Sequence, residues 1–178
     1  MEAEKVSRHP RVAGRCLTSH TGRKAVIYDN AVDGCCYLRG RGEEVSPFDF
    51  TVHNVKGQIF HFVQVDKCMF SDREEIRRCD CLVFNDTVSL FIDFKGNRSY
   101  NSRKKGRKSA LEQIATSVAW FMNEGLLQEQ ESVEVIVANG THNRHPRFND
   151  NIIDKTLELQ NRFPTLRIQY NELPFRKL

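Results

Sequence analysis

Three charged residues stand at the ends of two apolar segments in the stretch CDCLVFNDTVSLFIDFKG, which runs from residue 79 to residue 96. Asp80 precedes the first segment, and Asp93 and Lys95 close the second. Two carboxylates held close together repel each other, and partial burial increases this cost. A divalent cation relieves it, because Mg²⁺ binds carboxylate oxygens together with water and substrate phosphate. The three side chains suggest metal-assisted attack on phosphate, with the lysine activating water or stabilising charge.

A β-hairpin would bring these side chains together. The segment CLVF predicts a strand, NDT a turn and VSLFIDF a second strand. Across the turn, Phe84 can pair with Val88 or with Ser89. Both registers place Asp80 and Asp93 about 5 to 8 Å apart at the backbone.

Alternation along the second strand decides which side chains act together. Asp93 and Lys95 are two residues apart, so their side chains leave the same face, while Phe94 leaves the other face and can be buried. A simpler alternative stays open. Asp80 can be an exposed strand start, and Asp93 with Lys95 a surface ion pair of small energetic value.

A helix from about residue 109 to residue 123 follows the hairpin and offers a fourth candidate. Ser109 and Glu112 match a capping box, and Gly125 is a plausible stop. Gln113 lies off the apolar stripe and could reach back toward the hairpin end, or it is an ordinary solvated helix residue. The stripe consists of Leu111, Ile114, Ala115, Val118 and Met122.

A basic segment between the hairpin and the helix is predicted to be a polar loop. Lys and Arg side chains neutralise phosphates and guide a nucleic acid, and Tyr100 could stack on a base. Cations before a helix N-terminus are mildly unfavourable, which hints at an anionic partner. The alternative is a flexible, solvated loop, which tolerates this cost easily. The candidate contacts are Arg103, Lys104, Lys105, Arg107 and Lys108, with Arg98 beside them.

The composition is that of a globular protein of 178 residues, enough for one domain with a core. A net charge of +4 and a pI of about 8.8 permit contact with a polyanion without requiring it. We expect no signal peptide, no membrane span and a cytoplasmic location. The six cysteines show no C-x-x-C spacing, so free buried thiols in a reducing compartment are expected rather than zinc.

The order of elements indicates the fold class. From Gln58 onward the pattern predicts β-β-β-α-β-α-β, an α/β core over residues 58–178 with a hairpin at one side of a mixed sheet. Residues 1–57 are broken by Gly and Pro and predict only short strands or turns, packed on that core. His142 and His145, in a later turn-rich segment, could contact phosphate or metal, or be surface histidines.

The charged hairpin and the following helix resemble the core of the PD-(D/E)XK nuclease-like superfamily, over roughly residues 60–140. That core has an acid at the start of one strand, acid-x-Lys on the next strand, and then a helix. A closer similarity is to small bacterial members with Val-Asp-Gly-Cys, Arg-Cys-Asp, Glu-Leu-Lys-Gly and a helical Gln. The matching residues here are Val65-Asp66-Lys67-Cys68, Arg78-Cys79-Asp80, Asp93-Phe94-Lys95-Gly96 and Gln113.

This resemblance implies a restriction-endonuclease-like core, with Asp80 and Asp93 as ligands of Mg²⁺ or Mn²⁺. Lys95 would serve the attacking water, and Gln113 would complete the catalytic set. Lys67 stands where the pattern has glycine, and Asp93 where it has glutamate; neither change removes the metal chemistry. Many members also use an acid from an N-terminal helix, a place that Glu43 or Glu44 could fill, although both also fit surface positions.

The leading hypothesis is a metal-dependent nuclease that hydrolyses phosphodiester bonds in DNA or RNA, in repair or in defence against foreign nucleic acid. One alternative is a module on the same fold that binds nucleic acid or protein without cutting. Another is a structural subunit whose basic segment meets an acidic protein. Paired cutting of a duplex needs two active sites, so a homodimer is a further possibility.

Overall fold

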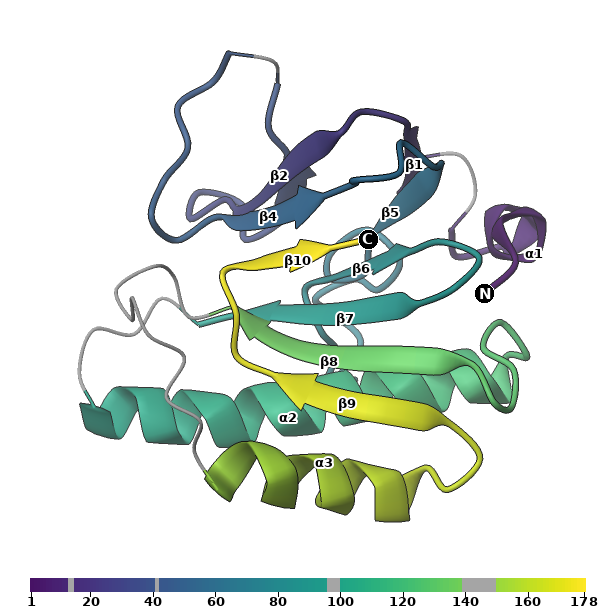
Figure 1. The fold of residues 1–178 in the computed structure, drawn as a ribbon, viewed down its shortest axis with the longest axis vertical. Helices are drawn as coiled ribbons and strands as arrows, with labels where there is room; N and C mark the ends of the chain where they lie inside the picture. Colours follow the sequence, from purple (N-terminus) through teal and green to yellow (C-terminus); the bar gives the residue numbers. More distant parts are fainter. Residues whose placement is uncertain (13–14, 41, 96–99, 139–149) are drawn as a thin grey trace.

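Three layers make up the molecule: a pair of helices, a six-stranded sheet and a four-stranded sheet (Figure 1). The computed structural model describes residues 1–12, 15–40, 42–95, 100–138 and 150–178, without the side chains of residues 100–104, 150 and 151. α2 (Tyr100–Asn123) and α3 (Asp150–Arg162) cover one face of the six-stranded sheet, and the four-stranded sheet covers the other. The expected mixed α/β fold is confirmed, but helices flank the central sheet on one face only.

The six-stranded sheet has the order β1-β5-β6-β7-β8-β9. Its first four strands are antiparallel neighbours, whereas β7, β8 and β9 run parallel because α2 and α3 connect them as crossovers. The predicted order β-β-β-α-β-α-β is confirmed from β5 onward, and a further strand, β10, follows. The strands are β1 (Leu17–His20), β5 (Phe60–Gln64), β6 (Cys81–Phe84), β7 (Ser89–Phe94), β8 (Ser132–Ala138) and β9 (Arg167–Asn171).

The four-stranded sheet has the order β10-β4-β2-β3, with only the β10–β4 pair parallel. Early and late parts of the chain contribute to both sheets, since β1 joins the larger sheet and β10 joins the smaller one. The strands are β2 (Lys24–Asp29), β3 (Cys36–Leu38), β4 (Phe50–His53) and β10 (Phe175–Lys177). The chain forms a single compact body.

Burial along the central strands follows from this layering. All six residues of β7 are buried, because helices cover one face and the small sheet covers the other. Phe91 belongs to the core under α2, and Leu90 and Phe94 belong to the core between the sheets. The edge strand β9 instead alternates between exposed and buried residues. A charge on β7 is therefore buried whichever face it occupies.

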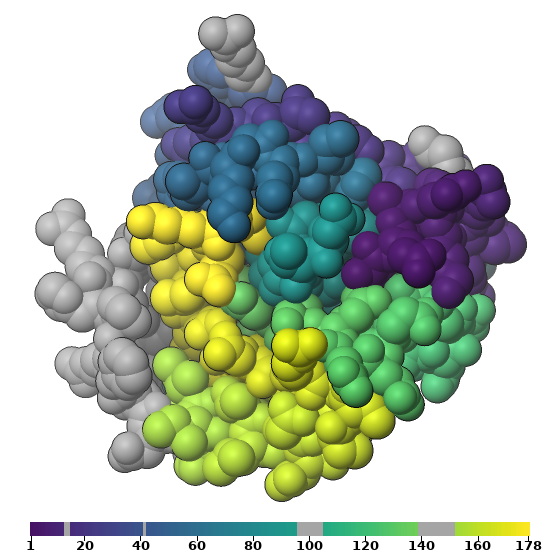
Figure 2. All heavy atoms as spheres, turned by 45° about the vertical axis from the view of Figure 1, so that its right-hand side comes forward, coloured from purple at the N-terminus to yellow at the C-terminus, as the bar shows by residue number. Residues whose placement is uncertain are grey.

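The N-terminal segment packs beside the end of α2. The short helix α1 (Ala3–Arg8) leads to His9, whose ring contacts Trp120 edge-on at 5.3 Å and whose Nε2 lies 3.3 Å from Glu124. Figure 2 shows this purple segment against the green part of the chain. The N-terminal segment therefore lies at the C-terminal end of α2, far from Tyr100, where the helix begins.

α2 begins well before the expected position. The structure starts it at Tyr100 rather than near Ser109, so the prediction of a basic loop there is wrong. Lys and Arg are good helix formers, and they outnumber the poor helix formers Asn101, Ser102 and Gly106 in this segment. Ser109 is no N-cap, because its Oγ lies inside the helix, 3.2 Å from Gln113 Oε1. The stop at Gly125, with φ of +66°, is confirmed.

The cysteines are not all free. Cys16 and Cys68 form a disulfide that ties the segment before β1 to the segment after β5, which corrects the expectation of free thiols throughout. A disulfide favours a non-reducing compartment, and this one hints at such a location without deciding it. Cys79 and Cys81 are free and buried, and they pack in different cores, although residues two apart on one strand would share a face. The reason is that β6 begins only at Cys81, after a bend at Asp80, so Cys79 lies outside the strand.

Candidate functional site

The β6–β7 hairpin adopts the second of the two predicted registers, with Phe84 opposite Ser89. Its ladder ends at Cys81, and the next N–H, that of Asp80, donates to the carbonyl of Ile92 at 3.1 Å. The Asp80 carboxylate then accepts the backbone N–H of Phe94 at 2.5 Å. The Asp80 carboxylate thus accepts the Phe94 N–H in place of the backbone carbonyl that a continued β-ladder would supply. This hydrogen bond holds the carboxylate beside the end of β7.

Asp93 lies on β7 with a side chain that is 0% exposed. Its Oδ1 forms an ion pair with Lys95 Nζ, as the shared strand face predicted. Apart from this ammonium, neither carboxylate oxygen has a hydrogen-bond partner within the described residues. A buried carboxylate with such spare acceptor capacity is costly, which makes it a strong candidate for binding a cation.

Gln113 connects Lys95 to α2. Lys95 Nζ donates to Gln113 Oε1 at 3.1 Å, and Gln113 Nε2 donates to the carbonyl of Arg78 at 3.2 Å. The expected reach of Gln113 toward the hairpin end is confirmed. These two bonds fix the amide and leave Lys95 only 17% exposed, so the ammonium is held in one place beside Asp93.

An ion pair that our sequence reasoning did not assign supports the start of β6. The Nε of Arg78 donates to Asp66 Oδ1 at 2.5 Å, and its Nη1 donates to the carbonyls of Glu74 and Ile76. The backbone N–H of Asp66 donates to the carbonyl of Asp80 at 3.2 Å. Asp66 belongs to the Val-Asp-x-Cys motif and Arg78 to the Arg-Cys-Asp motif. Their presence in these motifs was the sequence signal that could have identified the ion pair.

Burial is the largest influence on the pKa of both aspartates, and the charges of other carboxylates add to it. Burial, followed by the charge of Asp93, raises the pKa of Asp80 well above its ordinary value, although the Phe94 N–H works against this. Burial raises the pKa of Asp93 to about 6, against the opposing effect of Lys95. Both carboxylates therefore favour a proton or a cation over bare ionisation.

A further carboxylate reaches this region from the other sheet. Asp29 ends β2, and burial raises its pKa while Lys95 lowers it. Its charge also raises the pKa values of Asp80 and Asp93. Nothing in the local sequence around Asp29 signals this proximity, because the packing of one sheet on the other creates it.

The site lies where the carboxyl ends of β7 and β8 meet the N-terminal half of α2 (Figure 1). Among the described residues, no group of three or more histidine, cysteine or acidic side chains could hold a metal ion. Asp80 and Asp93 nevertheless fit the needs of Mg²⁺, which often takes one or two carboxylates and completes its shell with water and phosphate.

The basic candidates separate into three groups. Lys105 and Lys108 are exposed on the first turns of α2. Arg107 is less available for contact with a nucleic acid, because its Nε forms an ion pair with Glu172 Oε2 at 3.1 Å. The backbone of Arg103 and Lys104 is helical, and their side chains lie outside the described part of the chain, as does the Tyr100 side chain.

The remaining candidates do not add to the site. Arg98, His142 and His145 lie outside the described residues. Glu43 and Glu44 are exposed, and Glu43 lies 3.9 Å from an arginine of its own loop. In the described segments, no helix is long and apolar enough to span a bilayer.

With this geometry in hand, we compared the chain with known proteins. No family model, curated protein or solved structure matches it. Its function is therefore inferred from the arrangement of Asp80, Asp93, Lys95 and Gln113.

Proposed function

We propose that this protein is a nuclease that uses Mg²⁺ or Mn²⁺ to hydrolyse phosphodiester bonds in DNA or RNA. The observation that carries the proposal is Asp93, a fully buried carboxylate whose only partner among the described residues is the Lys95 ammonium. Asp80 lies close enough for the charge of Asp93 to raise its pKa. A fully buried carboxylate, a second carboxylate near it and a held ammonium suit phosphoryl chemistry better than they suit a stable core.

Each of the four side chains has a distinct role in this proposal. Asp80 and Asp93 would hold the cation, which polarises the phosphate and lowers the pKa of a bound water. Lys95 would orient the attacking water or stabilise the charge that develops on the phosphate oxygens. Gln113 is a positioning residue, because its bond to Lys95 keeps the ammonium aimed at the reaction centre.

Two further observations support a PD-(D/E)XK-like relationship. The antiparallel meander β5-β6-β7, followed by a helical crossover to the parallel strand β8, presents the acids in the order that the superfamily uses. Lys67 stands where the resembled pattern has glycine, and its φ of 61° lies in the left-handed region that favours glycine. The local backbone thus suits the residue type that the pattern prescribes.

A cleavage assay tests the proposal. Purified protein is incubated with single- and double-stranded DNA and RNA in Mg²⁺, Mn²⁺ or EDTA, beside Asp80→Asn, Asp93→Asn and Lys95→Met. We expect cation-dependent products from the parent protein and a loss of roughly a hundredfold or more in each variant. Asp86→Asn and Lys56→Met are the matched controls, because both residues are exposed and lie outside the site.

The alternative of a non-cutting module draws on one observation, the absence of a third protein ligand among the described residues. In that case the Lys95–Asp93 pair is a permanent structural feature and no cation enters. Nucleic-acid binding that EDTA leaves unchanged, with no product on any substrate and no Mn²⁺ uptake by calorimetry, would replace the nuclease proposal with this one.

A further inference from the structure

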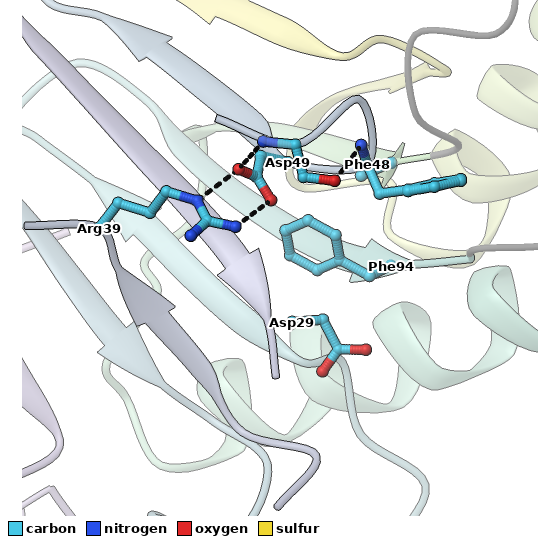
Figure 3. Close-up of a pocket in the computed structure, with 7 residues that line it drawn as sticks. Asp29, Arg39, Phe48, Asp49 and Phe94 are labelled. Carbon is cyan, nitrogen blue, oxygen red and sulfur yellow. Dashed lines mark hydrogen bonds and ion pairs between the residues drawn. The ribbon is translucent and has the colours of Figure 1, made fainter. Parts of the chain in front are cut away.

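A pocket of about 270 Å³ opens on the opposite face of β7 from Asp93, between the two sheets (Figure 3). Phe94 forms part of its wall, and Asp29 lies at its edge. Its lining residues are Asp29, Arg39, Ser46, Phe48, Asp49, Phe94 and Ala138. We propose that this pocket binds one unpaired nucleobase, guanine best, of the nucleic acid that the proposed nuclease acts on. The inference rests on the proposed function for its substrate class.

One charged pair in the pocket is already satisfied. Arg39 donates from Nε and Nη2 to the two oxygens of Asp49, at 2.5 and 3.1 Å, and Asp49 also accepts the backbone N–H of Ser46. The Arg39 guanidinium lies 4.3 Å above the ring of Tyr28, which holds it further. This pair contributes no net charge, and both oxygens of Asp49 accept hydrogen bonds within the protein, so we treat the pair as part of the pocket wall.

Among the described lining residues, Asp29 supplies the remaining charge of the pocket. In the described part of the chain its carboxylate has no hydrogen bond or ion pair, and Figure 3 shows it turned away from the Arg39–Asp49 pair and below the Phe94 ring. The negative balance of these described lining residues disfavours phosphate. It attracts a neutral group that presents N–H donors, because an ionised carboxylate only accepts hydrogen bonds.

The aromatic wall completes the match to a base. Phe94 and Phe48 line the pocket, and a base stacks on an aromatic face whatever its identity. The carboxylate then adds selectivity. Guanine carries two adjacent N–H donors on its Watson–Crick edge, whereas uracil and thymine flank a single N–H with carbonyl oxygens that a carboxylate repels. That edge must be unpaired to face Asp29, so the nucleic acid is single-stranded at this position.

The pocket also lies next to the proposed chemistry. Phe94 stands between Asp93 and Lys95 in the chain, and Asp80 holds its backbone N–H. The Asp29 carboxylate acts electrostatically on Lys95 across the end of the sheet. A base stacked on Phe94 therefore leaves its own sugar and phosphate at the end of β7 where the cation and Lys95 act, which divides recognition and cleavage between the two faces of one strand.

Binding of nucleosides in EDTA tests the inference without any cleavage. Guanosine and uridine are titrated into the full chain by calorimetry or by NMR. We expect guanosine to bind about tenfold more tightly than uridine, as hydrogen bonds to a charged group allow. Asp29→Asn should remove this preference, and Ala138→Leu, which fills the pocket, should abolish guanosine binding. Asp86→Asn makes the same charge change at an exposed site. It should keep both the binding of guanosine and its preference over uridine.

The outcomes separate this inference from the proposed function. Equal affinities for the two nucleosides, or an unchanged preference in Asp29→Asn, would overturn the base pocket even if the protein cleaves nucleic acid. Tighter binding of a small organic cation such as agmatine than of guanosine would also overturn it. If guanosine binds but no substrate is cleaved in Mg²⁺ or Mn²⁺, the base pocket would be supported and the nuclease proposal would be contradicted. A hexanucleotide with one abasic position repeats the test on a strand, where loss of the guanine base should weaken binding.

Discussion

At the scale of single residues, Asp93 dominates the behaviour of the site. It occupies a position on β7 that is covered on both faces, and its partner Lys95 does not compensate fully for the loss of solvation. A buried, incompletely paired carboxylate lowers stability whenever it is ionised. Proteins retain such groups where a ligand makes use of them, which is the reasoning behind the proposed cation site.

The pH dependence of stability follows from the raised pKa of Asp93. In EDTA the folded protein keeps a proton on Asp93 up to about pH 6, whereas the unfolded chain loses it near the ordinary value of 3.8. The folded state thus binds more protons between these values, so its free energy of unfolding falls as the pH rises from about 4 to about 6. Asp93→Asn should remove this loss and stabilise the protein at pH 7.5 by about 1 to 3 kcal/mol.

Urea unfolding at pH 4.5 and pH 7.5 measures this effect. The stabilising difference between Asp93→Asn and the parent should be larger at pH 7.5, and Asp86→Asn should show no such change. A difference that is the same at both pH values would mean that Asp93 stays ionised throughout, and that Lys95 compensates for its burial.

At the scale of elements, α2 carries both Gln113, the proposed positioning residue, and the exposed lysines of the basic segment. Because the segment is helical rather than a loop, these charges lie along one continuous element that leads away from the site. Their order along the helix makes them suitable for following a phosphate backbone.

The salt dependence of nucleic-acid binding tests this role of α2. Lys105→Ala and Lys108→Ala should each reduce the slope of log affinity against log salt by about 1, because each removes one phosphate contact. The measurement is fluorescence anisotropy with a labelled oligonucleotide in EDTA at several salt concentrations. Lys56→Ala, an exposed lysine in another turn, should leave the slope unchanged. Unchanged slopes in both α2 variants would place the nucleic acid elsewhere.

Two glycines at α2 should respond to alanine with opposite signs. Gly125 ends the helix with φ of +66°, and a methyl group added there would meet no atom of the described residues within 4 Å, so Gly125→Ala costs only backbone strain, about 1 kcal/mol. Gly106 lies inside the helix, where alanine is the better helix former, so Gly106→Ala should stabilise by about 0.5 to 1 kcal/mol. Denaturant unfolding compares the two variants; a stabilising Gly125→Ala would contradict the capping role.

At the scale of the whole molecule, the disulfide closes a loop of 52 residues between Cys16 and Cys68. Cys68 belongs to the segment that begins with Asp66, whose backbone N–H bonds to Asp80. The cross-link thus connects the N-terminal part of the chain to the support of the site. Loop closure of this length stabilises by about 4 kcal/mol in the chain-entropy model.

Reduction of this disulfide should therefore have a measurable cost. The melting temperature of the parent should fall in dithiothreitol, and Cys16→Ser with Cys68→Ser should show the lower value with or without reductant. Cys35→Ser, which replaces a free and partly exposed thiol, is the control. Its melting temperature should still fall in dithiothreitol. An unchanged parent melting temperature after complete reduction, verified by thiol labelling, would show that packing alone holds these segments.

What sequence reasoning predicted correctly is local. The alternation of apolar residues identified the hairpin and its two possible registers, and it placed Asp93 and Lys95 on one face with Phe94 on the other. The helical spacing located the buried stripe of α2 and the reach of Gln113. The start of α2 was missed because a run of charged residues resembles a solvated loop, although its helix propensity is high.

The sequence by itself determined the order of the elements from β5 to β9 and the faces of Asp93, Phe94 and Lys95, because both follow from backbone periods of two or 3.6 residues. Only the tertiary structure decided that the second sheet covers β7, that Asp29 joins the site and forms a pocket with Phe94, and that Cys16 meets Cys68. The physical reason is that burial and charge–charge interaction depend on distances between segments far apart in the chain. A local pattern of residues contains no information about those distances.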